Sequence, residues 1–269
     1  MNPGSVLEVR SVTVRFGGLT ALDAVSLEVP PRHVMGVIGP NGAGKTTLLN
    51  VLCGFIRPDH GDVLFAGRRH QVRPHQLAGL GVARTLQGVG LYNGLTALEN
   101  VMVGATCRAK AGFWSALLSL PRAGRDERVL RDLARQALDR VGATKVADMR
   151  PTELSYGMRK KVALARALAA KPSLILLDEP FSSLDALTRI AMHRLVLNLW
   201  ERHRPAILLV THDVDEALAL ADRVLVLADG RISYQCQVDA PRPRDRTAPE
   251  LTRLRTRLLA ELGVLEEGP

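Results

Sequence analysis

The stretch between residues 39 and 47 contains the residue types that bind phosphate. It consists of Gly39, Pro40, Asn41, Gly42, Ala43, Gly44, Lys45, Thr46 and Thr47. Small glycines let a backbone fold tightly, so that successive N–H groups point at one anion. In such a loop Lys45 would reach the β and γ phosphates of a nucleotide, and the Thr46 hydroxyl would bind Mg²⁺. The pattern therefore predicts a nucleotide phosphate site rather than an ordinary glycine-rich turn.

Other apolar segments end in polar side chains that could act on the same phosphates. The segment 173–177 runs into Asp178 and Glu179, and the segment 206–210 is followed closely by His212. Ligands of open α/β sheets bind outside the carboxyl ends of the strands. We therefore expect these side chains to face the phosphate loop. A short strand over 82–87 ends in Gln87, which is unremarkable by itself.

Three further residues have a structural and a functional interpretation that the residues alone leave open. Phe16 precedes the phosphate loop, where it could stack on a nucleobase or serve as a core residue at a strand end. Ser155 and Gly157, taken by themselves, are an ordinary start of a long helix, since serine is a preferred N-cap residue.

Composition indicates a globular protein. At 269 residues and 46% hydrophobic residues the chain can bury a large core. The cysteines Cys53, Cys107 and Cys236 lack metal-ligand spacing, which favours a reducing compartment and argues against a structural metal. No apolar run is long enough to cross a membrane, and the N-terminal segment lacks the apolar stretch of a signal peptide. The net charge of +9 includes arginines interspersed with acidic residues, which is typical of a solvated helix face and does not favour nucleic-acid binding.

Alternating strands and helices must position the polar groups. A buried strand over 34–38 precedes the phosphate loop, and a helix over 46–55 follows it. Strands over 6–16, 25–29 and 62–66 predict an antiparallel β element around the loop. We divide the chain into a nucleotide-binding domain over 1–236 and a tail over 237–269 with an amphipathic helix. Within that domain we expect a core over 1–90 and 151–236 and a helical subdomain over 91–150.

Taken together, these motifs resemble the ATP-binding-cassette (ABC) ATPases in order and spacing over nearly the whole chain. The matching segments are Gly39 to Thr46, Gln87, Leu154 to Met158, Leu174 to Glu179, Ser183 to Asp185, and His212. The resemblance implies an α/β P-loop NTPase fold, in which a RecA-like, mainly parallel sheet carries an antiparallel β subdomain and a helical insertion. It also implies ATP and Mg²⁺ as cofactors and ATP hydrolysis coupled to transport as the activity.

The resemblance assigns catalytic and metal-binding roles. Thr46 and Gln87 would bind Mg²⁺, and Asp178 would orient the ion through water. Glu179 would polarise the attacking water, and His212 would contact the γ-phosphate. The residues so placed in catalysis are Lys45, Gln87, Glu179 and His212. This division of roles agrees with phosphoryl transfer, in which positioning and charge stabilisation supply most of the acceleration.

The resemblance also implies a dimer. Two copies would sandwich two ATP molecules, each held by the phosphate loop of one copy and by Ser155 and Gly157 of the other. Asp185 would link the two sites, and Phe16 would stack on adenine. Tyr156 and Met158 depart from the commonest form of this signature, but the phosphate-facing Ser155 and Gly157 are intact, so we expect activity to be retained.

The sequence contains two different indications of the transported solute. Residues 8–170 resemble the ATPases of branched-chain amino acid importers, whereas residues from 180 onward resemble those of nitrate, sulfonate and taurine importers. Because the permease of this family docks near the Gln87 loop and the helical insertion, we favour branched-chain amino acids or related amino acids and amides, with a nitrate, sulfonate or taurine importer as the alternative.

The expected partners are a second ABC ATPase, as a homodimer or a heterodimer, integral membrane permease subunits, and indirectly a solute-binding protein. No nucleic acid is expected. The protein would lie on the cytoplasmic face of the inner membrane. A soluble cassette ATPase of DNA repair or translation is disfavoured, because the sequence has neither a long coiled coil nor a second cassette. Intact Lys45, Asp178 and Glu179 argue against a non-hydrolytic regulatory module.

Overall fold

The structure is a computed structural model that describes residues 4–69, 73–85, 89–108 and 121–264. Gln87 lies outside the described residues. The strands are β1 (Leu7–Phe16), β2 (Leu19–Val29), β3 (Val34–Ile38), β4 (His60–Phe65), β5 (Arg68–Arg69), β6 (Val82–Thr85), β7 (Leu174–Asp178), β8 (Ala206–Thr211), β9 (Arg223–Ala228) and β10 (Arg231–Gln237). The helices are α1 (Lys45–Leu52), α2 (Ala97–Ala105), α4 (Pro121–Arg140), α5 (Tyr156–Ala169), α6 (Ala186–His203), α7 (Val214–Leu220) and α8 (Pro249–Glu261). Short 3-10 turns cover Pro74–Gln76, Ala78–Leu80, Thr106–Arg108, Thr144–Val146 and Pro151–Glu153.

A mainly parallel sheet forms the centre of the fold, as predicted. Its strand order is β10-β9-β3-β8-β7-β6, and β10 pairs antiparallel with β9. The strands β3, β7 and β8 are fully buried and, apart from Asp178 and Thr211 at two of their ends, apolar, because both faces of a parallel sheet are covered. The carboxyl ends of β3, β7 and β8 therefore meet at one edge of this sheet.

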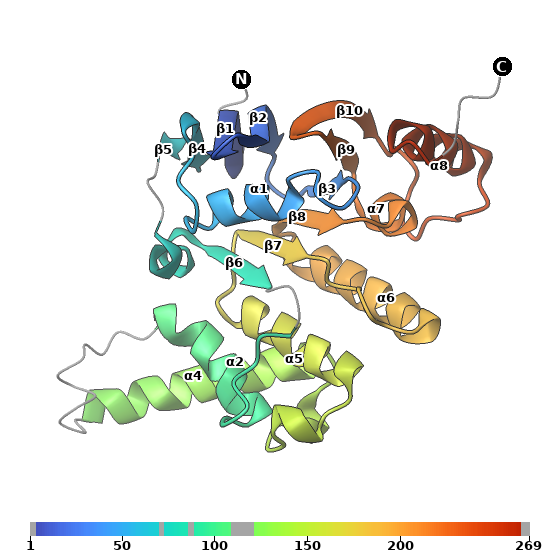
Figure 1. Cartoon of the computed structure of the whole chain (residues 1–269). Coiled ribbons are helices and arrows are strands. Elements are labelled where there is room, and N and C mark those ends of the chain that lie inside the picture. Colours follow the sequence, from blue (N-terminus) through green and yellow to red (C-terminus); the bar gives the residue numbers. More distant parts are fainter. Residues whose placement is uncertain (1–3, 70–72, 86–88, 109–120, 265–269) are drawn as a thin grey trace.

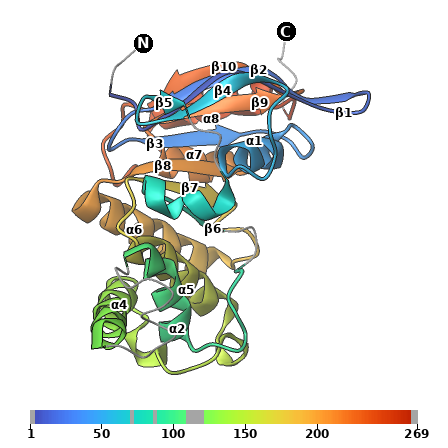
Figure 2. The ribbon, with the colours of Figure 1, turned by 90° about the vertical axis from the view of Figure 1, so that its left-hand side faces the viewer.

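The predicted antiparallel element is a second sheet with the order β2-β1-β4-β5, and in Figure 2 it lies above the strands β3, β8 and β7 of the central sheet. The strand expected over 25–29 is longer, since β2 begins at Leu19. Register shifts against β1 interrupt its alternation, and Ala24 has a left-handed φ of 50°. Such bulges insert extra residues into a strand, which hides its first half from a pattern of period two.

The other side of the central sheet faces helices. The larger apolar cluster combines residues of α2, α4, α5, α6 and α7 with the inner faces of the strands. In Figure 1 the helices α2, α4 and α5 lie together below β6 and β7. Among the described residues no helix is long and apolar enough to cross a membrane.

The C-terminal helix α8 packs against the same cluster. Leu251 and Leu258 are 3% and 0% exposed, and the partly buried Leu254, Leu259 and Leu262 pack against the same cluster. Arg255 pairs with Asp215 of α7 at 2.9 Å. Although we place a boundary at 237, α8 shares its apolar contacts with the rest of the chain. The domain boundaries themselves stay a prediction.

This packing predicts that the tail helix contributes to global stability. Leu258→Ala removes a fully buried side chain and should lower the free energy of unfolding by about 2–5 kcal/mol. Chemical denaturation measures the change. Val264→Ala is the control, because Val264 is 66% exposed and its truncation should cost less than about 0.5 kcal/mol. Equal effects of the two variants would contradict the packing described.

Candidate nucleotide-binding and catalytic site

The phosphate loop connects the end of β3 to the start of α1, as predicted. Gly44 is the N-cap of α1 with a left-handed φ of 102°, and no side chain caps this helix end. A Cβ atom at Gly44 would lie 2.4 Å from the carbonyl oxygen of Ala21, and one at Gly39 would lie 2.2 Å from that of Leu227. Both positions therefore require glycine, and the first N–H groups of α1 are left for an anion.

Lys45 is held inside this loop. Its Nζ donates to the carbonyl oxygens of Gly39 at 2.7 Å and Pro40 at 2.8 Å, and the residue is 6% exposed. Burial lowers the pKa of Lys45, and the negative charges of Glu179 and Asp178 oppose that shift. The ammonium group thus lies in the loop beside two carboxylates. An incoming phosphate could replace the two carbonyl oxygens as its acceptor.

Asp178 and Glu179 leave the end of β7 in different environments. Asp178 is 3% exposed, and burial raises its pKa while a hydrogen bond and the charge of Arg84 oppose the shift. Glu179 has a φ of 43°, which is unfavourable for a residue with a side chain, and its N–H donates to Val210. Strained backbone of this kind is concentrated at functional sites. The positive φ of Glu179 turns its side chain in a direction that the next residue of a regular strand would not have.

His212 follows β8, the neighbour of β7. Its Nδ1 lies 3.2 Å from Oε1 of Glu179, and its side chain is 55% exposed whereas that of Glu179 is 17% exposed. The next residue, Asp213, caps α7 by accepting from the N–H groups of Asp215 and Glu216. The end of β8 therefore places the imidazole of His212 beside the carboxylate of Glu179.

One cavity joins several of the predicted residues. It has a volume of about 490 Å³ and is lined by Phe16, Leu19, Thr20, Ala21, Asn41, Gly42, Gly44, Lys45, Thr46, Thr47, Glu179, Asp229 and Gly230. This volume lies within the usual range for ligand pockets. Phe16 is 50% exposed. It is therefore not a buried core residue at a strand end, so the structural interpretation of this residue is excluded. The cavity is thus lined both by an aromatic side chain and by the phosphate loop.

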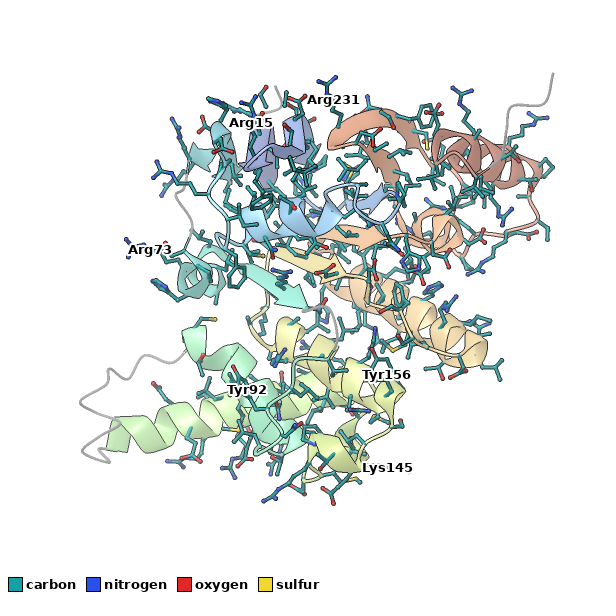
Figure 3. The ribbon with its side chains drawn as sticks, viewed as in Figure 1. Arg15, Arg73, Tyr92, Lys145, Tyr156 and Arg231 are labelled. Carbon is teal, nitrogen blue, oxygen red and sulfur yellow. The ribbon has the colours of Figure 1, made fainter. Side chains whose placement is uncertain are left out.

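Three predicted residues lie elsewhere in the chain. Ser155 and Asp185 are the N-caps of α5 and α6, and each accepts a hydrogen bond from its own helix. Gly157 faces the first turn of α6, since a Cβ atom there would lie 2.9 Å from Thr188. Figure 3 shows Tyr156, between Ser155 and Gly157, far from Arg15, the neighbour of Phe16. None of the three lines the cavity.

Sequence reasoning did not identify two charged residues near the site. Arg84 on β6 donates to Oδ2 of Asp178 at 3.0 Å, and Asp229 lines the cavity from the turn between β9 and β10. The available signal for Arg84 was its occurrence, as a charged residue, inside the short strand 82–87. No local signal connects Asp229 with the phosphate loop, because its approach to that loop depends on how β9 pairs with β3.

The fold and this site define an ATP-binding cassette ATPase. The family model described as ABC transporter matches residues 22–182. The aliphatic sulfonates import ATP-binding protein SsuB 1 of Pseudomonas fluorescens is 41% identical over 98% of this chain and 89% of its own length. The protein of the same name from Nocardia farcinica is 43% identical over 93% of this chain and 89% of its own length.

Solved structures agree. An ATP-binding cassette of an ABC transporter in its ADP conformation superimposes with a TM-score of 0.78 at 27% identity, covering 97% of this chain and 99% of that one. A dimeric cassette in a post-hydrolysis state with ADP and Pi gives a TM-score of 0.73 at 25% identity, covering 87% of this chain and 100% of that one. The chain belongs to the ABC transporter family as an ATP-binding subunit, and it is an ATPase. The predicted α/β P-loop NTPase fold is confirmed.

The comparisons favour a different solute from the one we favoured. The relatives above are named for the import of aliphatic sulfonates, which agrees with the alternative inferred from residues after 180. The resemblance of the first half to branched-chain amino acid importers finds no support among these relatives.

The loop geometry makes Gly44 a sensitive position. Gly44→Ala forces a left-handed alanine, which costs about 1–2 kcal/mol, and places a methyl group against the Ala21 carbonyl. We expect ATP affinity to fall at least about tenfold, which corresponds to about 1.4 kcal/mol, in titrations with a fluorescent ATP analogue. Gly18→Ala is the control, since no atom lies within 4 Å of its Cβ position. Unchanged affinity in Gly44→Ala would refute the role of this close approach.

Proposed function

We propose that this chain is the ATP-hydrolysing subunit of an importer, with the cavity beside the phosphate loop as one half of its ATP site. The observation that carries this proposal is a cavity lined by Phe16, Lys45 and Glu179 together. Adenine would stack on the exposed ring of Phe16. The phosphates would lie over the loop N–H groups, where Lys45 would exchange its carbonyl acceptors for phosphate oxygens.

The residues present fit a Mg²⁺ ion that arrives with ATP. Thr46 is exposed in the first turn of α1 and lines the cavity, while Asp178 is a buried carboxylate at the end of β7. Among the described residues no group of three or more His, Cys, Asp or Glu side chains could hold a metal. A site built from a hydroxyl, one carboxylate, phosphates and water is the kind that Mg²⁺ prefers. Thr46, Asp178 and Gln87 would hold the ion, which would neutralise phosphate charge.

Glu179 would orient and polarise the attacking water, with His212 beside it at the γ-phosphate. The 3.2 Å contact between the two side chains supports this division, because the imidazole can hold the carboxylate in place. No covalent intermediate is required, since charge stabilisation and positioning supply most of the rate enhancement in phosphoryl transfer.

Glu179→Gln tests this assignment. The change keeps the size of the side chain but removes its basicity, so steady-state ATP hydrolysis should fall about 100-fold or more while ATP binding is retained. Asp229→Asn is the matched control, because Asp229 lines the same cavity without a proposed chemical role, and its turnover should stay within about twofold of wild type. Unaffected turnover in Glu179→Gln would show that another group activates the water.

The second half of the ATP site would come from another copy. Ser155 and Gly157 lie outside the cavity of their own chain, and the N-terminus of α5 is a suitable place for phosphate. The dimeric relative with ADP and Pi supports this arrangement. Binding of ATP at the interface would favour the closed pair, and hydrolysis would remove the γ-phosphate that bridges it.

Ser155→Asp separates this role from helix capping. Aspartate is as good an N-cap as serine, but its charge would repel the γ-phosphate of the partner's ATP. In a Glu179→Gln background we expect monomer ATP affinity to stay within about twofold and ATP-dependent dimerisation, measured by analytical ultracentrifugation, to be lost. Thr96→Asp is the control, since Thr96 caps a different helix, α2. Dimerisation equal to that of the control would exclude Ser155 from the interface.

We further propose that the transported solute is an aliphatic sulfonate or a related small anion, because the similar relatives carry that name. The partners would be integral permease subunits, reached at the cytoplasmic face of the membrane, and a solute-binding protein. Deletion of the gene should abolish growth on an aliphatic sulfonate as the sole sulfur source but leave amino acid uptake unchanged. The reverse result would restore the amino acid assignment.

A further inference from the structure

A buried arginine connects three elements around the proposed Mg²⁺ site. Arg84 of β6 donates to Oδ2 of Asp178 on β7 at 3.0 Å and to Oδ1 of Asn50 on α1 at 3.1 Å. The two charged side chains are 11% and 3% exposed. The guanidinium also lies 5.7 Å from the centre of the Phe55 ring. Two of its nitrogen atoms are therefore held by acceptors on different elements, while its Nε is buried without a hydrogen-bond partner among the described residues.

The strand pattern explains why Arg84 and Asp178 meet. In β6 and β7, which are parallel, Arg84 is in register with Leu176, two residues before Asp178. Leu174, Leu176 and Val82 belong to the apolar cluster that includes Leu48 and Leu52 of α1. Because side chains alternate along a strand, Arg84 and Asp178 share the face covered by α1. An arginine at this position therefore approaches both the carboxylate and the helix.

We infer that Arg84 is a positioning residue for Mg²⁺–ATP, which holds Asp178 toward the ion and fixes α1, with Thr46 in its first turn, relative to β7. The inference rests on the proposed role of Asp178. The planar fork of arginine suits it to this task, since one guanidinium can donate to two acceptors at once. Groups that hydrogen-bond a metal-orienting carboxylate typically alter metal affinity about 10- to 100-fold when they are removed.

A purely structural ion pair is the competing explanation. Breaking such a pair destabilises the fold because it leaves a buried charge without a partner. It would not, however, alter the dependence on Mg²⁺ separately from stability. The experiment therefore needs a measurement that depends on Mg²⁺ binding. It also needs a control variant that removes another partly buried arginine, away from the proposed Mg²⁺ site.

The test compares Arg84→Gln with Arg242→Gln. Arg242 pairs with Asp222 at 2.8 Å and its side chain is 9% exposed, so its loss should also destabilise the fold. Three quantities are measured: ATP affinity in EDTA, the rise in Tm when Mg²⁺ is added to the ATP-bound protein, and the Mg²⁺ concentration for half-maximal hydrolysis.

For Arg84→Gln we expect ATP affinity in EDTA within about twofold of wild type, a smaller rise in Tm with Mg²⁺, and a half-maximal Mg²⁺ concentration about tenfold higher. Arg242→Gln should lower Tm without changing either Mg²⁺ readout. Identical Mg²⁺ readouts for the two variants would overturn the inference. If Arg84→Gln does not fold, Arg84→Lys replaces it: lysine retains the charge but not the fork, and an unchanged Mg²⁺ requirement would also overturn the inference. Wild-type hydrolysis that needs no Mg²⁺ would overturn the proposed metal site itself.

Discussion

The close approach of the phosphate loop to two neighbouring backbone segments is the constraint on which this structure depends. Gly39 lies against the Leu227 carbonyl of β9, and Gly44 lies against the Ala21 carbonyl of β2. A side chain at either position would push the loop away. Through these contacts the loop touches both sheets, so the antiparallel sheet that carries Phe16 is fixed relative to the parallel sheet that carries Glu179. The cavity between them is a consequence of this arrangement.

The parallel sheet then brings the charged groups together. Since β3 pairs with β8 and β8 pairs with β7, the residues that follow these strands converge at one edge. Lys45, Asp178 and Glu179 influence one another there: burial lowers the pKa of Lys45, and the two carboxylates oppose the shift. Phosphoryl transfer needs this kind of preorganised charge. Arg84 contacts Asp178 and His212 contacts Glu179, so each of the two carboxylates is held by a different partner.

The helix α5 is also connected to the end of β7, where Asp178 and Glu179 lie. Lys160 of α5 donates to the carbonyl oxygen of Pro180 at 2.8 Å and lies within 3.3 Å of that of Glu179. The helix that begins with Ser155 is therefore tied to the backbone of the strained glutamate. If contact with a partner displaced α5, Lys160 would transmit the displacement to the backbone of Glu179. Formation of the proposed dimer would in this way alter the position of the residue proposed to activate water.

The sequence by itself determined the local motifs and the fold class. The phosphate loop, the strand that ends in Asp178 and Glu179, and the N-cap of α5 could be predicted because turn geometry, burial and capping are decided by neighbouring residues. The first half of β2 could not, because bulges break its alternation. Only the tertiary structure decided that Phe16 lines the cavity, that His212 contacts Glu179, and that Arg84 holds Asp178. The last two contacts join residues 33 and 94 positions apart, so they depend on strand order and register, which no local pattern specifies.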